Sequence, residues 1–309
     1  LNAAGIGTNN TVVYTVGQEI RLILDSFEGK ARALKAGKPI TRTYETNMGG
    51  RFVSHLREVE ATKIFAKIRD LHGEACALDL LKKLAGDLGL GGDLIALSRG
   101  AGSIESKADK VCSYSNLKSL THPAFLRTVE RAGLHRNNVE QLENDVRRAG
   151  TLVARRVYQT FYADDNRRKW IGYLQREFSL TDLQARSILE SVDVLPASKR
   201  IPEDTYDTLA YPNMCNTEFP NHARAVQAFA EEGEFNLAEF KSAALRSPET
   251  GLVERLSNLS DFVLGYEITS ELAMRLVAAG TISVVESYGL RGISEEQWPG
   301  FGSVLKTMA

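Results

Sequence analysis

The sequence is poor in the residues that build disulfide frameworks and zinc sites. Its three cysteines, Cys76, Cys112 and Cys215, lie far apart and form no CxxC pair, and its five histidines form neither an HExxH nor an HxH pair. This pattern is typical of buried or incidental thiols in a reducing compartment. It also argues against zinc, so we expect no metal and no cofactor.

Long apolar runs and catalytic signatures are also missing. No stretch of 18 apolar residues occurs, so we expect no membrane partner. The beginning lacks the layout of a signal peptide, and Leu1 in place of Met favours a numbering that starts inside a longer chain. There is no GxSxG nucleophile elbow, and the glycines between Gly86 and Gly102 match neither GxGxxG nor GxxxxGK[ST]. We therefore expect no catalytic residues and no enzymatic activity.

One tetrapeptide imitates a catalytic motif. Tyr162-Ala163-Asp164-Asp165 spells YADD, which in reverse transcriptases holds metal-binding aspartates in a β-hairpin. The polar residues that follow, 166–169, cannot form the buried strand that such a hairpin requires. We interpret the two aspartates as a break between helices.

The sequence is rich in helical periodicity. Apolar residues recur at spacings of three and four over 16–34, 52–71, 75–86 and 135–162, whereas strict alternation is nearly absent. We predict an all-α fold, a two-lobed helical bundle of about ten to twelve helices with extended terminal arms. The best strand candidate is Thr11–Tyr14, and residues 99–121 are expected to form a loop. The expected parts are a flexible N-terminal arm (1–14), an N-terminal lobe (15–120), a second lobe with an irregular connection at 195–221 (121–297) and a C-terminal tail (298–309).

Charge is unevenly distributed along the chain. Residues 1–202 contain 31 Lys and Arg against 23 Asp and Glu, whereas residues 203–309 contain 7 against 16, although the whole chain carries only −1. Within residues 147–176, eight cations accompany only two acids. A polyanion partner fits this stretch, and the acidic third favours contact between copies of the chain.

A single helix over about 139–162 would place arginines opposite an apolar stripe. Arg148 and Arg155, seven residues apart, would lie about 10 Å apart, a spacing that suits successive phosphates. Interleaved aromatic rings could stack on bases. The opposing interpretation is a solvated charged face with aromatic rings in the core. The candidate RNA-binding residues are Arg147, Arg148, Arg155, Arg156, Arg167, Arg168, Lys169, Arg176, Tyr158 and Tyr162.

This plan resembles that of RNA-virus nucleocapsid proteins and of flexuous plant-virus coat proteins. Leu195-Pro196, Ala210-Tyr211-Pro212 and Phe219 are similar in order and separation to a stretch of phenuivirus nucleoproteins. This chain is longer and lacks their methionine-rich run. The resemblance implies a helical body with single-stranded RNA in a basic groove, an arm that docks on the next subunit, and a location in the virion or host cytoplasm.

The sequence therefore predicts a self-assembling protein that coats single-stranded RNA as a filament or ring. The first alternative is a helical scaffold that binds proteins and no nucleic acid. The second is an enzyme whose site is assembled from residues distant in the sequence.

Overall fold

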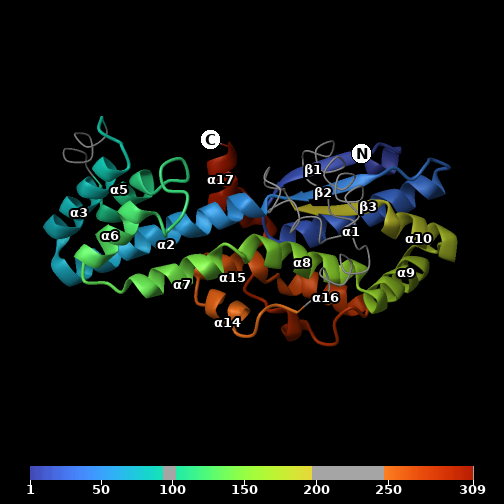
Figure 1. The fold of residues 1–309 in the computed structure, drawn as a ribbon. Helices are drawn as coiled ribbons and strands as arrows, with labels where there is room; N and C mark the ends of the chain where they lie inside the picture. Colours follow the sequence, from blue (N-terminus) through green and yellow to red (C-terminus); the bar gives the residue numbers. More distant parts are fainter. Residues whose placement is uncertain (93–101, 197–246, 309) are drawn as a thin grey trace, which may run out of the picture. The chain divides into compact units, whose positions relative to one another are not determined.

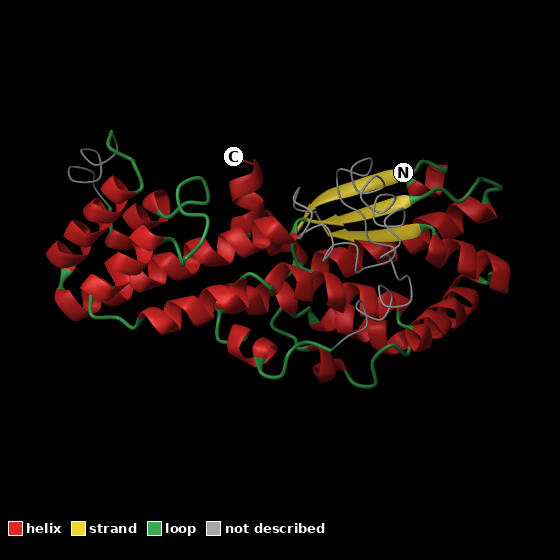
Figure 2. Cartoon of the chain, in the orientation of Figure 1, coloured by secondary structure: helices red, strands yellow, loops and turns green. Residues whose placement is uncertain are grey.

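The computed structural model describes residues 1–92, 102–196 and 247–308 (Figure 1). The predicted helical class is confirmed, with one small parallel sheet among the described residues (Figure 2). The helices are α1 (Val16–Lys35), α2 (Gly49–His72), α3 (Glu74–Asp87), α5 (Ile104–Val111), α6 (Pro123–Arg131), α7 (Arg136–Val146), α8 (Ala149–Tyr162), α9 (Asp164–Phe178), α10 (Asp182–Glu190), α14 (Leu252–Leu256), α15 (Ser260–Tyr266), α16 (Ser270–Ala278) and α17 (Gly302–Met308). The strands are β1 (Thr8–Val13), β2 (Thr43–Asn47) and β3 (Val192–Pro196), and short 3-10 helices are η1 (Asn2–Ala4), η2 (Val285–Tyr288) and η3 (Glu295–Gly300).

The chain forms two compact units. Unit 1 contains residues 1–51 and 149–309, and unit 2 contains residues 52–148. The expected boundary at residue 120 does not coincide with this division, because β3 returns to pair with β2 across a long stretch of sequence. The described part of the acidic C-terminal third, residues 247–308, and the N-terminal 51 residues thus fold into the same unit. The uneven charge along the sequence does not separate two lobes.

Unit 2 is a helical bundle with its own core. The buried side chains come from α2, α3, α5, α6 and α7, and Phe65 meets Phe125 with ring centroids 6.4 Å apart. The predicted loop at 99–121 is wrong over α5. Its N-cap Ser103 accepts a hydrogen bond from the Ser106 backbone, and Ile104 and Ala108 bury at helical spacing. This short apolar pattern was hidden by the surrounding Gly, Ser and Lys.

The sheet of unit 1 has the strand order β1-β2-β3, with all strands parallel. Because β1 includes Thr8–Val13, the expected flexible arm is wrong for these residues. Asn2 is also tied down: its Nδ2 donates to Ser26 Oγ at 3.2 Å, and its Oδ1 accepts from Thr43 Oγ1 at 3.1 Å. These polar contacts hold a segment that has little apolar surface of its own.

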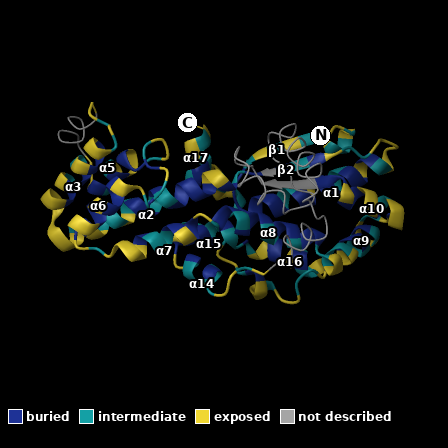
Figure 3. Ribbon diagram, viewed as in Figure 1, coloured by how far each residue is buried: buried dark blue, intermediate teal, exposed yellow. Residues whose placement is uncertain are grey.

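Helix α1 organises the core of unit 1. Thr15 and Gln18 form a capping box at its start, and most of its apolar residues, including Ile20, Ile23 and Phe27, are buried (Figure 3). Phe27 meets Phe161 of α8 and Trp170 of α9, each with centroids 5.8 Å apart. This aromatic contact fixes α8 and α9 against α1.

The C-terminal tail packs on unit 1. Phe301 is buried, and the Tyr14 hydroxyl donates to Thr307 Oγ1 of α17 at 2.6 Å. Leu305 and Met308 of the same helix remain 54% and 73% exposed. The tail therefore buries one side and presents apolar side chains on another.

Candidate nucleic-acid interface

The predicted helix over 139–162 is two helices. α7 ends at Val146 and α8 begins at Ala149, with Arg147 and Arg148 in the turn between them. The Arg148 amide donates to the Asp145 carbonyl at 3.1 Å, which closes the last turn of α7. Arg147 and Arg148 belong to unit 2, whereas Arg155 and Arg156 belong to unit 1. The expectation that one continuous helix carries the row of arginines is therefore wrong.

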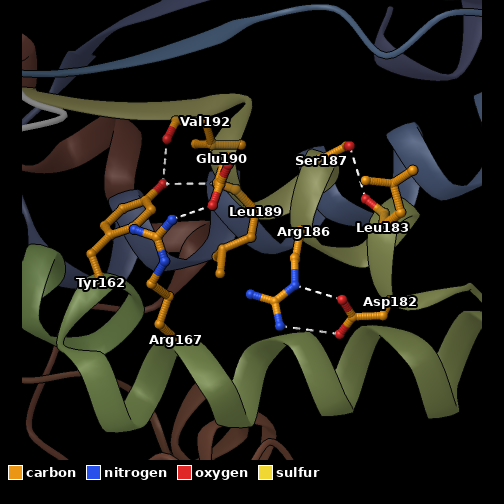
Figure 4. Close-up of polar contacts among 9 residues, drawn as sticks. All are labelled: Tyr162, Arg167, Asp182, Leu183, Arg186, Ser187, Leu189, Glu190 and Val192. Atoms are coloured by element: carbon orange, nitrogen blue, oxygen red, sulfur yellow. Dashed lines mark hydrogen bonds and ion pairs between the residues drawn. The ribbon is translucent and has the colours of Figure 1, made fainter.

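Helix α8 is buried around most of its circumference. The expectation that the side of this helix opposite its apolar stripe is exposed to solvent is therefore wrong. Tyr158 and Tyr162 are buried, and the Tyr162 hydroxyl donates to the backbone carbonyls of Val192 and Leu189, the latter at 3.4 Å (Figure 4). Their rings are therefore not exposed platforms for bases in this structure. Trp170 is likewise in the core, where its Nε1 donates to the Thr160 carbonyl at 2.8 Å.

The Arg156 side chain contacts the segments that contain Tyr266 and Tyr288. Its Nη1 donates to the Tyr266 carbonyl at 3.0 Å, and its Nη2 donates to the Tyr288 carbonyl. The guanidinium carbon lies 4.1 Å and 3.9 Å from the ring centroids of the same two tyrosines. Two carbonyls and two rings thus occupy this cation, which joins α8 to the C-terminal segments.

An open groove of about 510 Å³ borders Arg156 within unit 1. Its lining includes the neutral polar side chains Gln159, Asn166, Ser257 and Thr281. Arg156 is the cation among the described lining residues, and its guanidinium already binds backbone carbonyls. The groove therefore adds no ready site for a phosphate.

Helix α9 carries three of the exposed cations of the predicted stretch, Arg168, Lys169 and Arg176, and Arg147 is exposed in the turn before α8. The predicted break between helices is present, but it lies at Ala163, and Asp164 and Asp165 belong to the first turn of α9. Arg168, Lys169, Gly172 and Arg176 share one face, because steps of three, four and seven residues return to the same side of a helix. We call these four residues the α9 cationic face.

Gly172 shapes this face. A Cβ placed on it would lie 3.3 Å from Nη1 of Arg176, so the guanidinium folds back over the glycine. Lys169 and Arg176 are about 10 Å apart along the helix axis. Because Gly172 has no side chain, nothing projects from this face of the helix between Lys169 and Arg176. The charged residues of the sequence alone did not indicate this feature.

Two of the predicted cations, Arg167 and Arg168, have carboxylate partners. Arg167 pairs with Glu190 of α10, and Arg186 of α10 pairs with Asp182, Nε to Oδ2, at 2.5 Å (Figure 4). Arg168 pairs with Asp165, but both side chains are exposed, so this pair is weak and exchangeable. Within the described segments, Lys169 and Arg176 form no ion pair. On α9, these two cations are the most available for a polyanion.

Other classes of site find little support in the described residues. No group of three or more His, Cys, Asp or Glu side chains among them is arranged to hold a metal ion. Cys76 and Cys112 are free thiols, and Cys215 lies outside the described residues. No helix in the described parts of the chain combines the length and the apolar character needed to cross a membrane.

A buried polar cluster lies beneath the sheet and was missed in the sequence. Glu19 and Lys30 of α1 are fully buried, as are Glu45 and Asn47 of β2. Burial raises the pKa of Glu45 to about 8, and burial and the neighbouring Glu45 charge raise that of Glu19 well above its usual range. The available signal was the position of Glu19 and Lys30 on the apolar stripe of 16–34.

Comparison with known proteins gives no relative. No protein-family model, curated protein or solved structure matches this chain. Of the residues that carry the resemblance to phenuivirus nucleoproteins, Leu195-Pro196 ends β3, whereas Ala210-Tyr211-Pro212 and Phe219 lie outside the described residues. The resemblance therefore stays a prediction.

Proposed function

We propose that this protein coats single-stranded nucleic acid, RNA foremost, and assembles with copies of itself in the manner of a viral nucleocapsid or coat protein. The observation that carries the proposal is the α9 cationic face. Lys169 and Arg176 present two cations that form no ion pair with described residues, at a spacing that suits neighbouring phosphates, and Arg168 adds an exchangeable third. Contacts of this kind bind backbone and not bases, so the binding is largely independent of sequence.

Self-assembly forms the second part of the proposal. Its support is α17, which anchors through Phe301 and Thr307 yet exposes Leu305 and Met308. Apolar side chains exposed on an anchored terminal helix suit contact with another subunit. A location in the virion or host cytoplasm belongs to the same proposal, and no catalytic role is assigned.

The proposal is tested by purifying the protein without nuclease, measuring its ratio of absorbance at 260 and 280 nm, and imaging it by electron microscopy. Rings or filaments with a high ratio, which lose nucleic acid in high salt, are the expected result. Monomers free of nucleic acid that also fail to bind added single-stranded RNA at low salt would contradict it.

A scaffold that binds proteins is the second candidate. The observation in its favour is that α9 and α10 contain ion pairs: Arg167 pairs with Glu190, and Arg186 pairs with Asp182. Charges that are paired within the chain leave less excess positive charge on this surface for a polyanion. A ratio of absorbance at 260 and 280 nm typical of protein free of nucleic acid, together with a protein complex that persists in high salt, would favour this function.

A further inference from the structure

The open groove of about 510 Å³ beside Arg156 is lined by several hydroxyl groups. Its walls come from α8, α9, α14, α15 and η2 and from the turns after α14 and α16, all within unit 1. Its volume lies in the range of about 300–1,000 Å³ that is usual for the sites of small molecules. The hydrogen bonds that its lining residues already make decide which class of ligand it can hold.

Three serine and threonine hydroxyls of the lining use their protons within the chain. Ser257 Oγ donates to the backbone carbonyl four residues earlier at 2.7 Å, and Ser287 Oγ donates to the carbonyl three residues earlier at 2.7 Å. Thr281 Oγ1 donates to the carbonyl five residues earlier at 3.0 Å. A hydroxyl group has one proton and two lone pairs, so these three oxygens are left as acceptors.

The other polar groups of the lining are committed in the same way. Thr160 Oγ1 donates to the Arg156 carbonyl at 2.7 Å, so the Tyr288 hydroxyl, 2.7 Å from the same oxygen, must be the donor in the contact between them. Glu267 accepts from Arg291 Nε at 3.0 and 3.1 Å, and hydrogen bonds from Arg291 lower the pKa of Glu267, so this carboxylate is ionised at neutral pH. These five hydroxyl groups and this carboxylate offer acceptors and no uncommitted proton.

The charges of the lining argue against ionic ligands. Phosphate and carboxylate groups bring acceptors of their own, which find no partner among acceptor oxygens. An organic cation would meet the Arg156 guanidinium, which is part of the lining and repels a like charge. A neutral ligand that donates several hydrogen bonds fits best.

The aromatic rings of the lining argue against a stacked nucleobase. The Tyr266 ring centroid lies 4.9 Å from that of Phe262, in a stacked arrangement, and 4.1 Å from the Arg156 guanidinium carbon. Tyr288 is buried and contacts the same guanidinium. The rings are occupied by contacts within the chain, whereas sites for bases depend on open aromatic surfaces. Recognition in this groove therefore depends on hydrogen bonds.

We propose that this groove binds a neutral saccharide. Sugar hydroxyl groups donate to the oxygens of Ser257, Thr281 and Ser287, and each sugar hydroxyl also accepts. The lining supplies amide protons for that purpose: Asn166 uses one of its two for the Gln159 carbonyl, at 3.0 Å. This site is independent of the nucleic-acid proposal.

The test measures binding of sugars to the full chain by saturation-transfer difference NMR and by calorimetric titration. The probes are glucose, galactose, N-acetylglucosamine, cellobiose and lactose at millimolar concentration, with their phosphorylated forms and spermidine as anionic and cationic comparisons. We expect at least one neutral sugar to bind. Its phosphorylated form and spermidine should bind about tenfold more weakly or not at all, because the groove leaves their charges unpaired.

Two variants locate the site. Ser257→Ala removes one acceptor oxygen from the lining and should weaken sugar binding by about threefold to tenfold, the effect of one ordinary hydrogen bond. Ser187→Ala is the matched control, because Ser187 Oγ also donates to the carbonyl four residues earlier, at 2.8 Å, but lies outside the lining. Ser287→Ala repeats the test at an exposed position, where the change leaves the fold intact.

The results that would overturn the proposal are distinct from one another. Absence of binding by every neutral sugar would remove the ligand class. Affinity of Ser257→Ala and Ser287→Ala equal to that of Ser187→Ala would place any sugar site elsewhere. Tighter binding of a phosphorylated sugar or of spermidine than of the neutral sugars would contradict the argument from the hydrogen-bond acceptors and from Arg156.

Discussion

The guanidinium carbon of Arg156 lies 3.9 Å from the ring centroid of Tyr288, and its Nη2 donates to the backbone carbonyl of the same tyrosine. The tyrosine hydroxyl, in turn, lies 2.7 Å from Thr160 Oγ1, one turn further along α8. Helix α8 and the segment around η2 are thereby joined at two points. An arginine that the sequence assigns to RNA is a structural residue here.

This contact predicts a loss of stability in Arg156→Ala. The change removes two charge-assisted hydrogen bonds and the contacts of the guanidinium with two tyrosine rings. The free energy of unfolding should therefore fall by about 2–4 kcal/mol. Arg168→Ala is the matched control, because its exposed ion pair with Asp165 is worth about 0.5 kcal/mol or less. Urea unfolding of both variants measures the difference, and equal losses would contradict the structural role of Arg156.

The contact between Gly49 and Gly150 predicts a steric effect. A Cβ on Gly150 would lie 2.7 Å from the backbone of Gly49, so Gly150→Ala should destabilise the protein by about 1–3 kcal/mol. A Cβ on Gly50 meets nothing within 4 Å, and Gly50→Ala should be neutral or slightly stabilising. Thermal unfolding distinguishes them; a harmless Gly150→Ala would mean that the two helix starts do not touch.

Unit 2 contains a buried ion pair whose removal should be costly. Arg57 Nε donates to both carboxylate oxygens of Glu143 at 2.9 and 3.0 Å, and the Leu120 amide donates to Glu143 Oε2 at 2.9 Å. Glu143→Ala leaves the arginine and the amide unpaired, with an expected loss of about 3–5 kcal/mol. Glu140→Ala, at an exposed pair with Arg136, should cost about 0.5 kcal/mol or less. Hydrogen exchange should show the loss in α7, and unchanged protection there would refute it.

The two described cysteines should differ in reactivity. Cys76 is exposed, whereas burial, followed by the charges of Asp109 and Glu58, raises the pKa of Cys112 to about 12. In a Cys215→Ser background at pH 8, we expect a chromogenic disulfide reagent to react with one thiol in the native protein and with a second only on unfolding. Adding Cys76→Ser should abolish the native reaction; two rapidly reacting native thiols would contradict the burial of Cys112.

The helices were predictable because their signals are local. Thr121-His122-Pro123 marks the start of α6, Thr181 caps α10 and Gly280 follows α16 with a positive φ of 74°, and each of these signals lies within a few residues of the helix end. Strand β2 was not predictable, because Thr43, Glu45 and Asn47 present polar side chains where a strand pattern requires apolar ones. Its inward residues are explained only by Glu19 and Lys30 across the core.

The candidate interface was predictable in part. Arg168, Lys169 and Arg176 lie on an exposed face, as their charge suggested. Trp170 is buried against Phe27 of α1, far away in the sequence, and the Tyr162 hydroxyl donates to the Val192 carbonyl of β3. Contacts at such separations leave no local pattern.

The α9 cationic face is tested most directly by the salt dependence of RNA affinity. The measurement compares Arg168→Ala/Lys169→Ala/Arg176→Ala with a control of equal charge change in unit 2, Lys67→Ala/Lys110→Ala/Lys118→Ala, whose lysines are exposed and form no ion pair with described residues. The slope of log affinity against log salt should become shallower by about 2 for the α9 variant, because each lost phosphate contact on a single strand contributes about 0.7. The control should keep the slope of the unchanged protein. Equal slopes and affinities for all three folded proteins would contradict the assignment of RNA binding to the α9 cationic face.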